Sequence, residues 1–133
     1  MAGLIATARA KGVSSYVGDG ARHWPAVRRL DLARVFRLAV EKAPAGSVLH
    51  GIAEEGVAMR GIAEVIGRHL DVPVTSVPPE PQPEHPTWQA AYATFDMVVS
   101  SALTRELPGW QPIHPGLLED LGQGHYFAAP VTA

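Results

Sequence analysis

Two adjacent arginines are the clearest candidates for ligand chemistry in this sequence. Arg28 and Arg29 form its only adjacent basic pair, and a guanidinium group can hold a carboxylate or phosphate through two parallel hydrogen bonds. The same side chains could instead pair with Asp19 or Asp31, or be solvated, because surface ion pairs are common and weak. Arg28 is therefore a candidate substrate-binding residue, with a structural ion pair as the alternative.

Three aromatic residues are further candidates for substrate contact. Trp24 lies in an irregular segment beside the turn at Gly18 to Gly20, and Trp88 and Tyr92 are spaced as on one face of a helix. Binding pockets favour aromatic walls. Apolar residues at helical spacing are, however, more often core than binding site. We keep substrate binding and core packing as the two interpretations of Trp24, Trp88 and Tyr92.

No pattern of metal-binding or catalytic residues is found in the chain. Its six histidines, at positions 23, 50, 69, 85, 114 and 125, include no pair at i, i+4 and no His-Glu-x-x-His sequence. Cysteine is absent, which excludes disulfides and thiolate ligands. The Gly-x-Ser-x-Gly turn of a hydrolase nucleophile is also missing. Glu54 and Glu55 are expected to be loop carboxylates near the start of the next helix.

Length and composition favour one compact domain over residues 1–133. The chain is 47% hydrophobic and 18% charged, with a formal net charge of −2, values typical of a globular protein. The charge gives no reason to expect nucleic acid or an anionic membrane as a partner. No stretch reaches the roughly 18 apolar residues of a membrane span. The start is a poor secretory signal, and with no cysteine to pair we expect a cytoplasmic protein.

The hydrophobic periodicity predicts short strands and several helices. We expect strands over residues 13–17, 47–52 and 72–77, with an extended piece over residues 22–30. Helices are expected over residues 4–11, 31–43, 57–70, 88–95, 102–107 and 115–126. In the second of these, Asp31 is the expected N-cap, and Leu32, Val35, Phe36, Ala39 and Val40 form one apolar face. The fold class is thus α/β, with an α+β-like pattern of few short strands and four to six helices.

Four stretches follow one another along most of the chain: Tyr16-Val-Gly-Asp-Gly20 with Trp24-Pro-Ala-Val-Arg-Arg-Leu-Asp31, Gly46-Ser-Val-Leu-His-Gly-Ile-Ala53, Ile66-Gly-Arg-His-Leu-Asp-Val-Pro73, and Ser100-Ser-Ala-Leu-Thr-Arg-Glu-Leu-Pro-Gly-Trp-Gln-Pro112. In this order they resemble the C-terminal part of the extended short-chain dehydrogenases, the group of NAD(P)-dependent epimerases, dehydratases and reductases. Arg28 stands where similar reductases have a histidine, and Pro108 is inserted before Gly109. The resemblance implies that Trp24 lines the substrate cleft and that the chain is the substrate-binding segment of a Rossmann-type oxidoreductase.

The parts of that family that bind the cofactor and do the chemistry are missing. The sequence has no glycine-rich phosphate-binding turn, and neither Lys11 nor Lys42 has a tyrosine four residues before it. We therefore expect no dinucleotide-binding domain, no catalytic residue and no cofactor bound by this chain alone. The resemblance implies NAD(P) for the full-length family, and whether this chain belongs to an active enzyme stays open.

Two functions remain as hypotheses. The leading one is the substrate-binding portion of an NAD(P)-dependent oxidoreductase or epimerase, which takes a small-molecule substrate and needs a missing N-terminal Rossmann half. The alternative is a stand-alone binding or oligomerisation module without enzymatic activity. Uncovered strand edges favour self-association. We accordingly expect a homo-oligomer, most simply a dimer, formed through residues 47–52 or 4–10.

Overall fold

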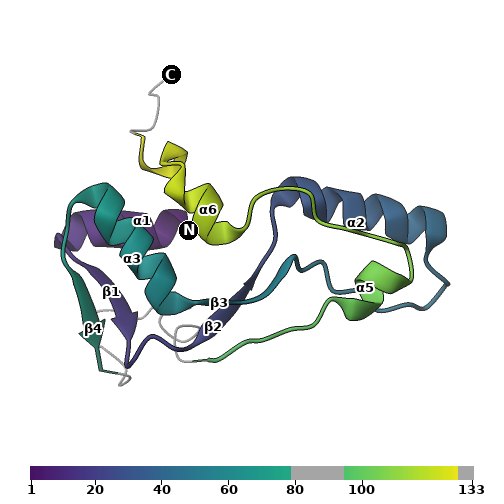
Figure 1. Cartoon of the computed structure of the whole chain (residues 1–133), viewed down its shortest axis with the longest axis horizontal. Coiled ribbons are helices and arrows are strands. Elements are labelled where there is room, and N and C mark those ends of the chain that lie inside the picture. The colour runs from purple at the N-terminus through teal and green to yellow at the C-terminus, as the bar shows by residue number, and fades with distance from the viewer. Residues whose placement is uncertain (79–94, 129–133) are drawn as a thin grey trace.

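The computed structural model describes residues 1–78 and 95–128 and shows a mixed α/β chain (Figure 1). The expected class, a few short strands with several helices, is confirmed in these residues. In chain order the elements are α1 (Ala2–Lys11), β1 (Ser14–Val17), β2 (His23–Ala26), α2 (Arg29–Lys42), β3 (Glu54–Ala58), α3 (Met59–Leu70), β4 (Val74–Val77), α5 (Ala102–Glu106), α6 (Leu117–Gly122) and the 3-10 helix η1 (His125–Phe127).

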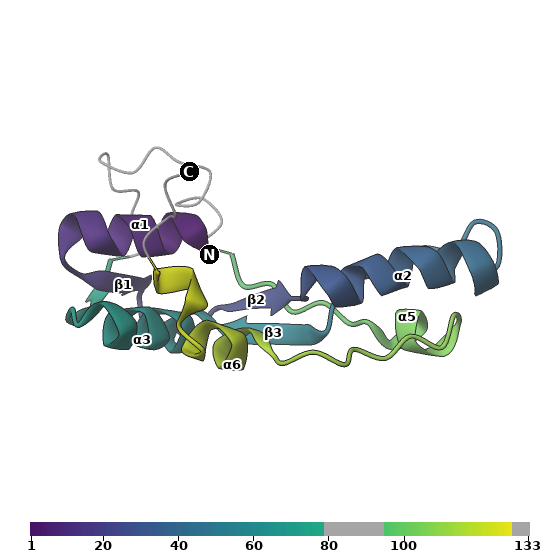
Figure 2. The ribbon, with the colours of Figure 1, turned by 90° about the horizontal axis from the view of Figure 1, so that it is seen from above.

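The hydrophobic core lies at one end of the molecule, around α3. This helix buries the face that its sequence spacing predicts, with Ile62, Ala63 and Ile66 almost fully inaccessible to solvent. Ile5 of α1 and Leu121 of α6 pack into the same cluster. In Figure 2, β1 lies between α1 and α3, and both helices contact it. The core is thus made by segments from the start, middle and end of the chain.

The four strands form two separate two-stranded sheets. β1 and β4 run parallel, with Ser14 opposite Val74, and α3 lies between them in the sequence. β2 and β3 run antiparallel, with Trp24 opposite Val57 and an irregularity between Trp24 and Ala26. Both strands expected over residues 13–17 and 72–77 are therefore confirmed, and the extended piece contains β2. The helix expected from residue 57 starts two residues later, because Val57 belongs to β3.

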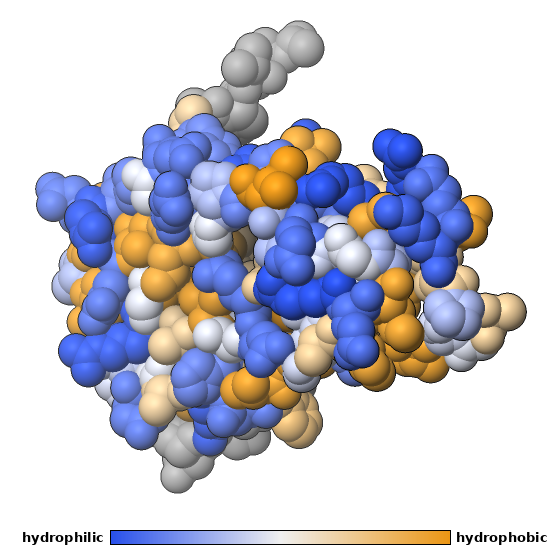
Figure 3. Space-filling model, turned by 45° about the vertical axis from the view of Figure 1, so that its right-hand side comes forward, coloured by the Kyte–Doolittle hydropathy of each residue, from blue (hydrophilic) through white to orange (hydrophobic). Residues whose placement is uncertain are grey.

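Helix α2 departs from its predicted cap and from its predicted burial. It begins at Arg29, so Arg28 is the N-cap and Asp31 is not. The expected apolar face is only partly covered: Val35 is buried, whereas Phe36 is 68% and Val40 is 90% exposed. Figures 1 and 2 show the reason, because α2 and α5 lie at the end of the molecule away from the core. Figure 3, with that end turned forward, shows apolar surface between charged groups.

The strand expected over residues 47–52 is not formed. These residues have no regular structure, and the next strand, β3, starts at Glu54. Backbone N–H groups of Ser47 and Ile52 bond to nearby carbonyls, but those of residues 48–51 donate to no described residue. A strand needs a neighbour to pair with, and the described part of the chain offers none here. The expected association through residues 47–52 stays a prediction, although these residues form no strand.

Three further helix predictions concern the C-terminal half of the chain. The short helix at residues 102–107 is confirmed as α5, whereas the last predicted helix is divided into α6 and η1 at Gln123 and Gly124. Gly124 has φ 83°, a left-handed conformation that ends an α-helix. The helix predicted over residues 88–95 lies almost wholly outside the described residues. Phe95, its last residue, is exposed and is not helical.

Candidate functional site

A hollow among the described residues lies between α2, β3 and α6. Its volume is about 470 Å³, within the range of small-molecule pockets. Arg28 and Arg29 line it from the start of α2, Glu54 from β3, and Asp120 and Tyr126 from the C-terminal segment. We call this hollow the Arg28 pocket. The remaining lining residues are Met1, Ala26, Val27, Asp31, Ala53, Pro115, Leu117 and His125.

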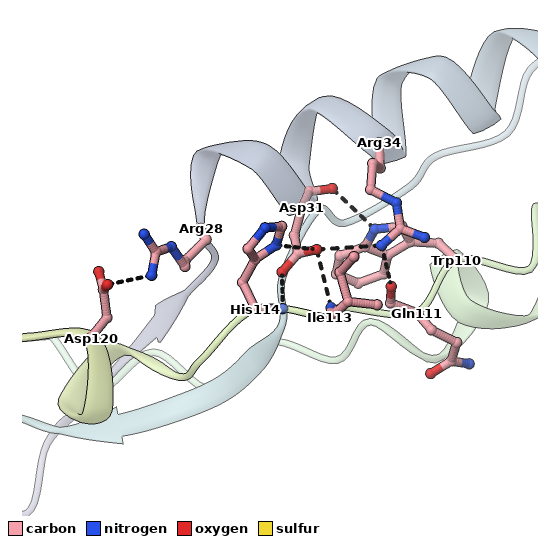
Figure 4. A network of polar contacts seen from close by, with 8 residues as sticks. All are labelled: Arg28, Asp31, Arg34, Trp110, Gln111, Ile113, His114 and Asp120. Atoms are coloured by element: carbon pink, nitrogen blue, oxygen red, sulfur yellow. Dashed lines mark hydrogen bonds and ion pairs between the residues drawn. The ribbon is translucent and has the colours of Figure 1, made fainter.

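Asp120 is the polar centre of the Arg28 pocket. Its side chain is only 3% exposed and accepts a hydrogen bond from Arg28 Nη1, as Figure 4 shows. Its other carboxylate oxygen accepts a bond of 2.7 Å from the Tyr126 hydroxyl, and His125 Nε2 lies 3.8 Å from Asp120 Oδ1. Such a buried carboxylate must be paired to be tolerated. The pairing holds the guanidinium group of Arg28 in the wall of the pocket.

Tyr126 is the one tyrosine of the pocket, and its proton is held by the neighbouring carboxylate. The hydrogen bond to Asp120 raises the pKa of Tyr126 above its ordinary value, and burial and the negative charge of Asp120 act in the same direction. A phenol whose pKa is raised keeps its proton at neutral pH. Tyr126 is thus a poor general base and serves the pocket as an aromatic wall with a polar edge.

A second network ties the C-terminal segment to α2 and so positions the pocket. Asp31 is 1% exposed, and its carboxylate accepts backbone N–H bonds of 3.1 Å each from Ile113 and His114. His114 Nδ1 lies 3.0 Å from Asp31 Oδ1. The buried Trp110 indole donates a bond of 3.0 Å to the Asp31 carbonyl. Figure 4 shows these contacts converging on the start of α2.

The Asp31 network favours the ionised carboxylate. Burial acts to raise the pKa of Asp31, but the nearby His114 side chain and the hydrogen bonds from the Ile113 and His114 backbone outweigh it and leave the pKa below its ordinary value. Arg34 adds a positive charge, with Nη1 3.5 Å from Asp31 Oδ1. The prediction that Asp31 caps its own helix is therefore wrong. This carboxylate instead accepts hydrogen bonds from backbone that lies 82 and 83 positions further along the chain.

Two glutamates of β3 attach the strand to the C-terminal part of the chain. The Glu54 carboxylate accepts the backbone N–H of Leu117, the first residue of α6. The Glu55 carboxylate accepts the N–H of Ser101 at 3.0 Å, just before α5. A Cβ atom at Gly116 would lie 2.6 Å from Glu54 Oε1, so a larger residue here would require the Glu54 carboxylate to shift. We expected both carboxylates to lie in a loop near the start of the following helix. The structure instead places them in β3, where each accepts a hydrogen bond from a distant segment.

Both arginines that the sequence offered for ligand chemistry, Arg28 and Arg29, line the pocket. Arg28 lines it but pairs with Asp120, and not with Asp19 or Asp31. Trp24 lies in β2, partly buried against the core cluster, and does not line the pocket. This position fits the core interpretation of Trp24, and its role in substrate binding stays a prediction. Trp88 and Tyr92 lie outside the described residues.

Sequence reasoning missed Asp120, His125 and Tyr126. They are 92 or more positions from Arg28, and no spacing rule connects residues so far apart. The sequence offers one signal for these residues. Asp120, His125 and Tyr126 are polar groups that lie within seven positions of one another, next to an apolar run. Such a cluster suggests a site only once its partner is known.

Other parts of the described chain offer weaker sites. A crevice between α1, β1 and α3 has a volume of about 40 Å³, too small for an organic ligand. His23 Nδ1 lies 3.0 Å from Asp96 Oδ1, but both side chains are largely exposed. Over residues 1–78 and 95–128, no group of three or more acidic or histidine residues is arranged to hold a metal ion. Nor does any helix in these ranges have the length and apolar character to cross a membrane.

Comparison with known proteins finds two curated relatives. The uncharacterized protein C2A9.02 of Schizosaccharomyces pombe is 46% identical over 124 residues, which are 93% of this chain and 42% of the relative. The uncharacterized protein YLL056C of Saccharomyces cerevisiae is 46% identical over 118 residues, 89% of this chain and 40% of the relative. This chain thus spans about two fifths of the length of the relatives it matches. No family model and no solved structure matches it.

Proposed function

We propose that this chain is the substrate-binding portion of an NAD(P)-dependent oxidoreductase or epimerase of the extended short-chain dehydrogenase group. The single observation that carries the proposal is that the backbone N–H groups of residues 48–51 donate to no described residue. This segment follows a helix and precedes β3, where the family resemblance implies a late strand. A strand of this kind stays unformed when the sheet that it joins is absent.

Three further features agree with a missing larger sheet. Among residues 1–78 and 95–128, the parallel sheet of β1 and β4 has two strands, whereas parallel sheets are ordinarily larger and covered on both faces. Part of the apolar face of α2 is uncovered, at Phe36 and Val40, whereas the apolar face of an amphipathic helix is normally packed against the rest of the protein. The chain spans 42% and 40% of its two relatives. The rest of such a longer chain would supply the sheet and the cofactor site.

In this proposal the Arg28 pocket is the substrate end of the active site. The catalytic tyrosine, its lysine and the dinucleotide-binding turn would all lie on the part of the protein outside this chain. The residues of this chain bind and orient the substrate and exclude water from it. The function of the whole enzyme then requires both parts in one molecule.

A chimera tests the proposal directly. Residues 1–133 would replace the matching part of the S. pombe relative, and the oxidation of NADPH and NADH would be followed with a panel of aldehydes and ketones. We expect turnover by the chimera and by the intact relative, and none by residues 1–133 alone. Carbonyl reduction by the isolated chain, abolished by a substitution within it, would contradict the proposal. So would an inert chimera whose parent relative reduces the same carbonyls.

The second candidate is a stand-alone binding or oligomerisation module. The exposed apolar side of α2 favours it, because a second copy of the chain could cover Phe36 and Val40. Light scattering over a range of concentrations separates the two candidates when combined with the chimera. A stable dimer together with an inert chimera would favour the module. A monomer that melts cooperatively would show that no second copy is needed.

A further inference from the structure

The Arg28 pocket contains positive groups with unused hydrogen-bond donors. Arg28 donates from Nη1 to Asp120 and has four further N–H donors in its guanidinium group, none of which bonds to a described residue. Arg29 also lines the pocket, and its side chain has no hydrogen bond or ion pair with the described residues. Both side chains belong to the start of α2, whose first turn has no side-chain cap.

The three carboxylates that line the pocket are, by contrast, already engaged. Asp120 accepts from Arg28 and Tyr126. Asp31 accepts two backbone N–H bonds and lies near the positive charge of Arg34. Glu54 accepts the N–H of Leu117. The acceptors are thus largely satisfied inside the protein, and the donors that remain belong to the two guanidinium groups.

The rest of the pocket wall is mainly apolar. Ala26, Val27, Pro115 and Leu117 line it together with the ring of Tyr126. A ligand that fits would have an apolar body and one group able to accept several hydrogen bonds from guanidinium. A planar carboxylate matches that donor geometry, since guanidinium and carboxylate can form two parallel bonds.

We propose that the Arg28 pocket takes a small organic carboxylic acid, with the acid group held by Arg28 and Arg29 and the apolar body against Tyr126 and Pro115. This inference rests on the proposed function for the identity of the pocket as a substrate site, and it narrows the substrate to carbonyl compounds that also carry a carboxylate. The binding itself does not need the missing part of the enzyme.

Titration of residues 1–133 with benzoate and with its neutral isostere benzamide tests the proposal. Chemical-shift changes in NMR spectra would give the two dissociation constants. We expect benzoate to bind at least about tenfold more tightly, because charge-assisted hydrogen bonds are about twice as strong as neutral ones. The preference should weaken as salt is added, since Arg29 is exposed.

Matched arginine variants locate the binding. R29Q should weaken benzoate binding about tenfold, whereas R37Q, on the same helix but outside the pocket, should leave it unchanged. R28K keeps the positive charge beside Asp120, so the melting temperature should be preserved. It removes the planar guanidinium group that can form two parallel hydrogen bonds with a carboxylate, so benzoate binding should weaken. Equal affinity for benzoate and benzamide would overturn the proposal, as would an equal loss in R37Q and R29Q.

The chimera distinguishes failure of this inference from failure of the proposed function. A chimera that reduces neutral ketones but gains nothing from a carboxylate on the substrate would overturn the inference and leave the proposed function standing. If benzoate binding depends on Arg29 but the chimera is inert, the pocket binds carboxylates and the proposed oxidoreductase function is contradicted.

Discussion

At the residue scale, Asp31 connects the two halves of the pocket wall. Its backbone belongs to α2, and its carboxylate holds the segment that leads to Asp120 and Tyr126. A fully buried carboxylate that accepts two N–H bonds is stabilising only while all its partners are present. The position of the residues that line the pocket from the C-terminal segment thus depends on the Asp31 side chain.

We expect Asp31→Ala to lower the free energy of unfolding by about 3 kcal/mol, because it removes a buried carboxylate that His114 and Arg34 surround and leaves two partly buried N–H groups without an acceptor. Urea denaturation measures this change. Glu41→Gln, at an exposed end of the same helix, is the control and should change stability little. A loss in Asp31→Ala no larger than in the control would contradict the role given to this network.

The acid dependence of stability should come partly from Asp31. Its pKa in the folded protein lies below the ordinary value, so its contribution is fully present above about pH 4, the unfolded pKa, and is lost as pH falls through the folded pKa. Asp31→Ala should therefore flatten the decline of stability with acid. Denaturation midpoints of the two proteins that decline in parallel below pH 4 would refute this assignment.

At the element scale, two helices end at a residue in the left-handed backbone conformation. Gly12 ends α1 with φ 63° in open space, and Asp71 ends α3 with φ 53°, the only non-glycine residue with positive φ among those described. A left-handed conformation strains a residue with a side chain and suits glycine. The two positions therefore offer opposite substitutions.

Asp71→Gly should raise the free energy of unfolding by about 0.5–1 kcal/mol, and Gly12→Ala should lower it by about 1 kcal/mol. Thermal and urea denaturation give both values. Each variant is the other's control, because both positions have the left-handed backbone conformation and one substitution removes a side chain where the other adds one. Two shifts of the same sign would show that side-chain contacts, and not φ, decide these positions.

Local elements could be predicted where the signal lies within a few residues. The face of α3, the glycine that ends α1 and the strands β1 and β4 follow from periodicity and turn residues. The predicted start of α2 is wrong because aspartate is a common N-cap residue, whereas the Asp31 carboxylate accepts hydrogen bonds from the backbone of residues 113 and 114. The strand at residues 47–52 failed because pairing depends on a neighbour, not on the apolar run alone. Arg28 was found, but its partner Asp120 was beyond any local rule.

At the scale of the whole molecule, the structure has one well-packed end and one sparsely covered end. The cluster around Ile62 and Ile66 is closed, whereas α2 and α5 lie away from it with apolar side chains in solvent (Figures 1 and 3). Soluble monomers rarely expose large contiguous apolar surfaces. The proposed longer enzyme accounts for this asymmetry, since its remaining part would cover α2 and pair with residues 48–51.

The most direct test of this account is the binding of the dinucleotide. Calorimetric titration of NAD and NADP, oxidised and reduced, would be carried out on residues 1–133 and on the chimera with the S. pombe relative. The account predicts stoichiometric binding of at least one dinucleotide by the chimera and no specific binding by residues 1–133, which lack the phosphate-binding turn. Tight stoichiometric binding to the isolated chain, or none to a folded chimera, would contradict it.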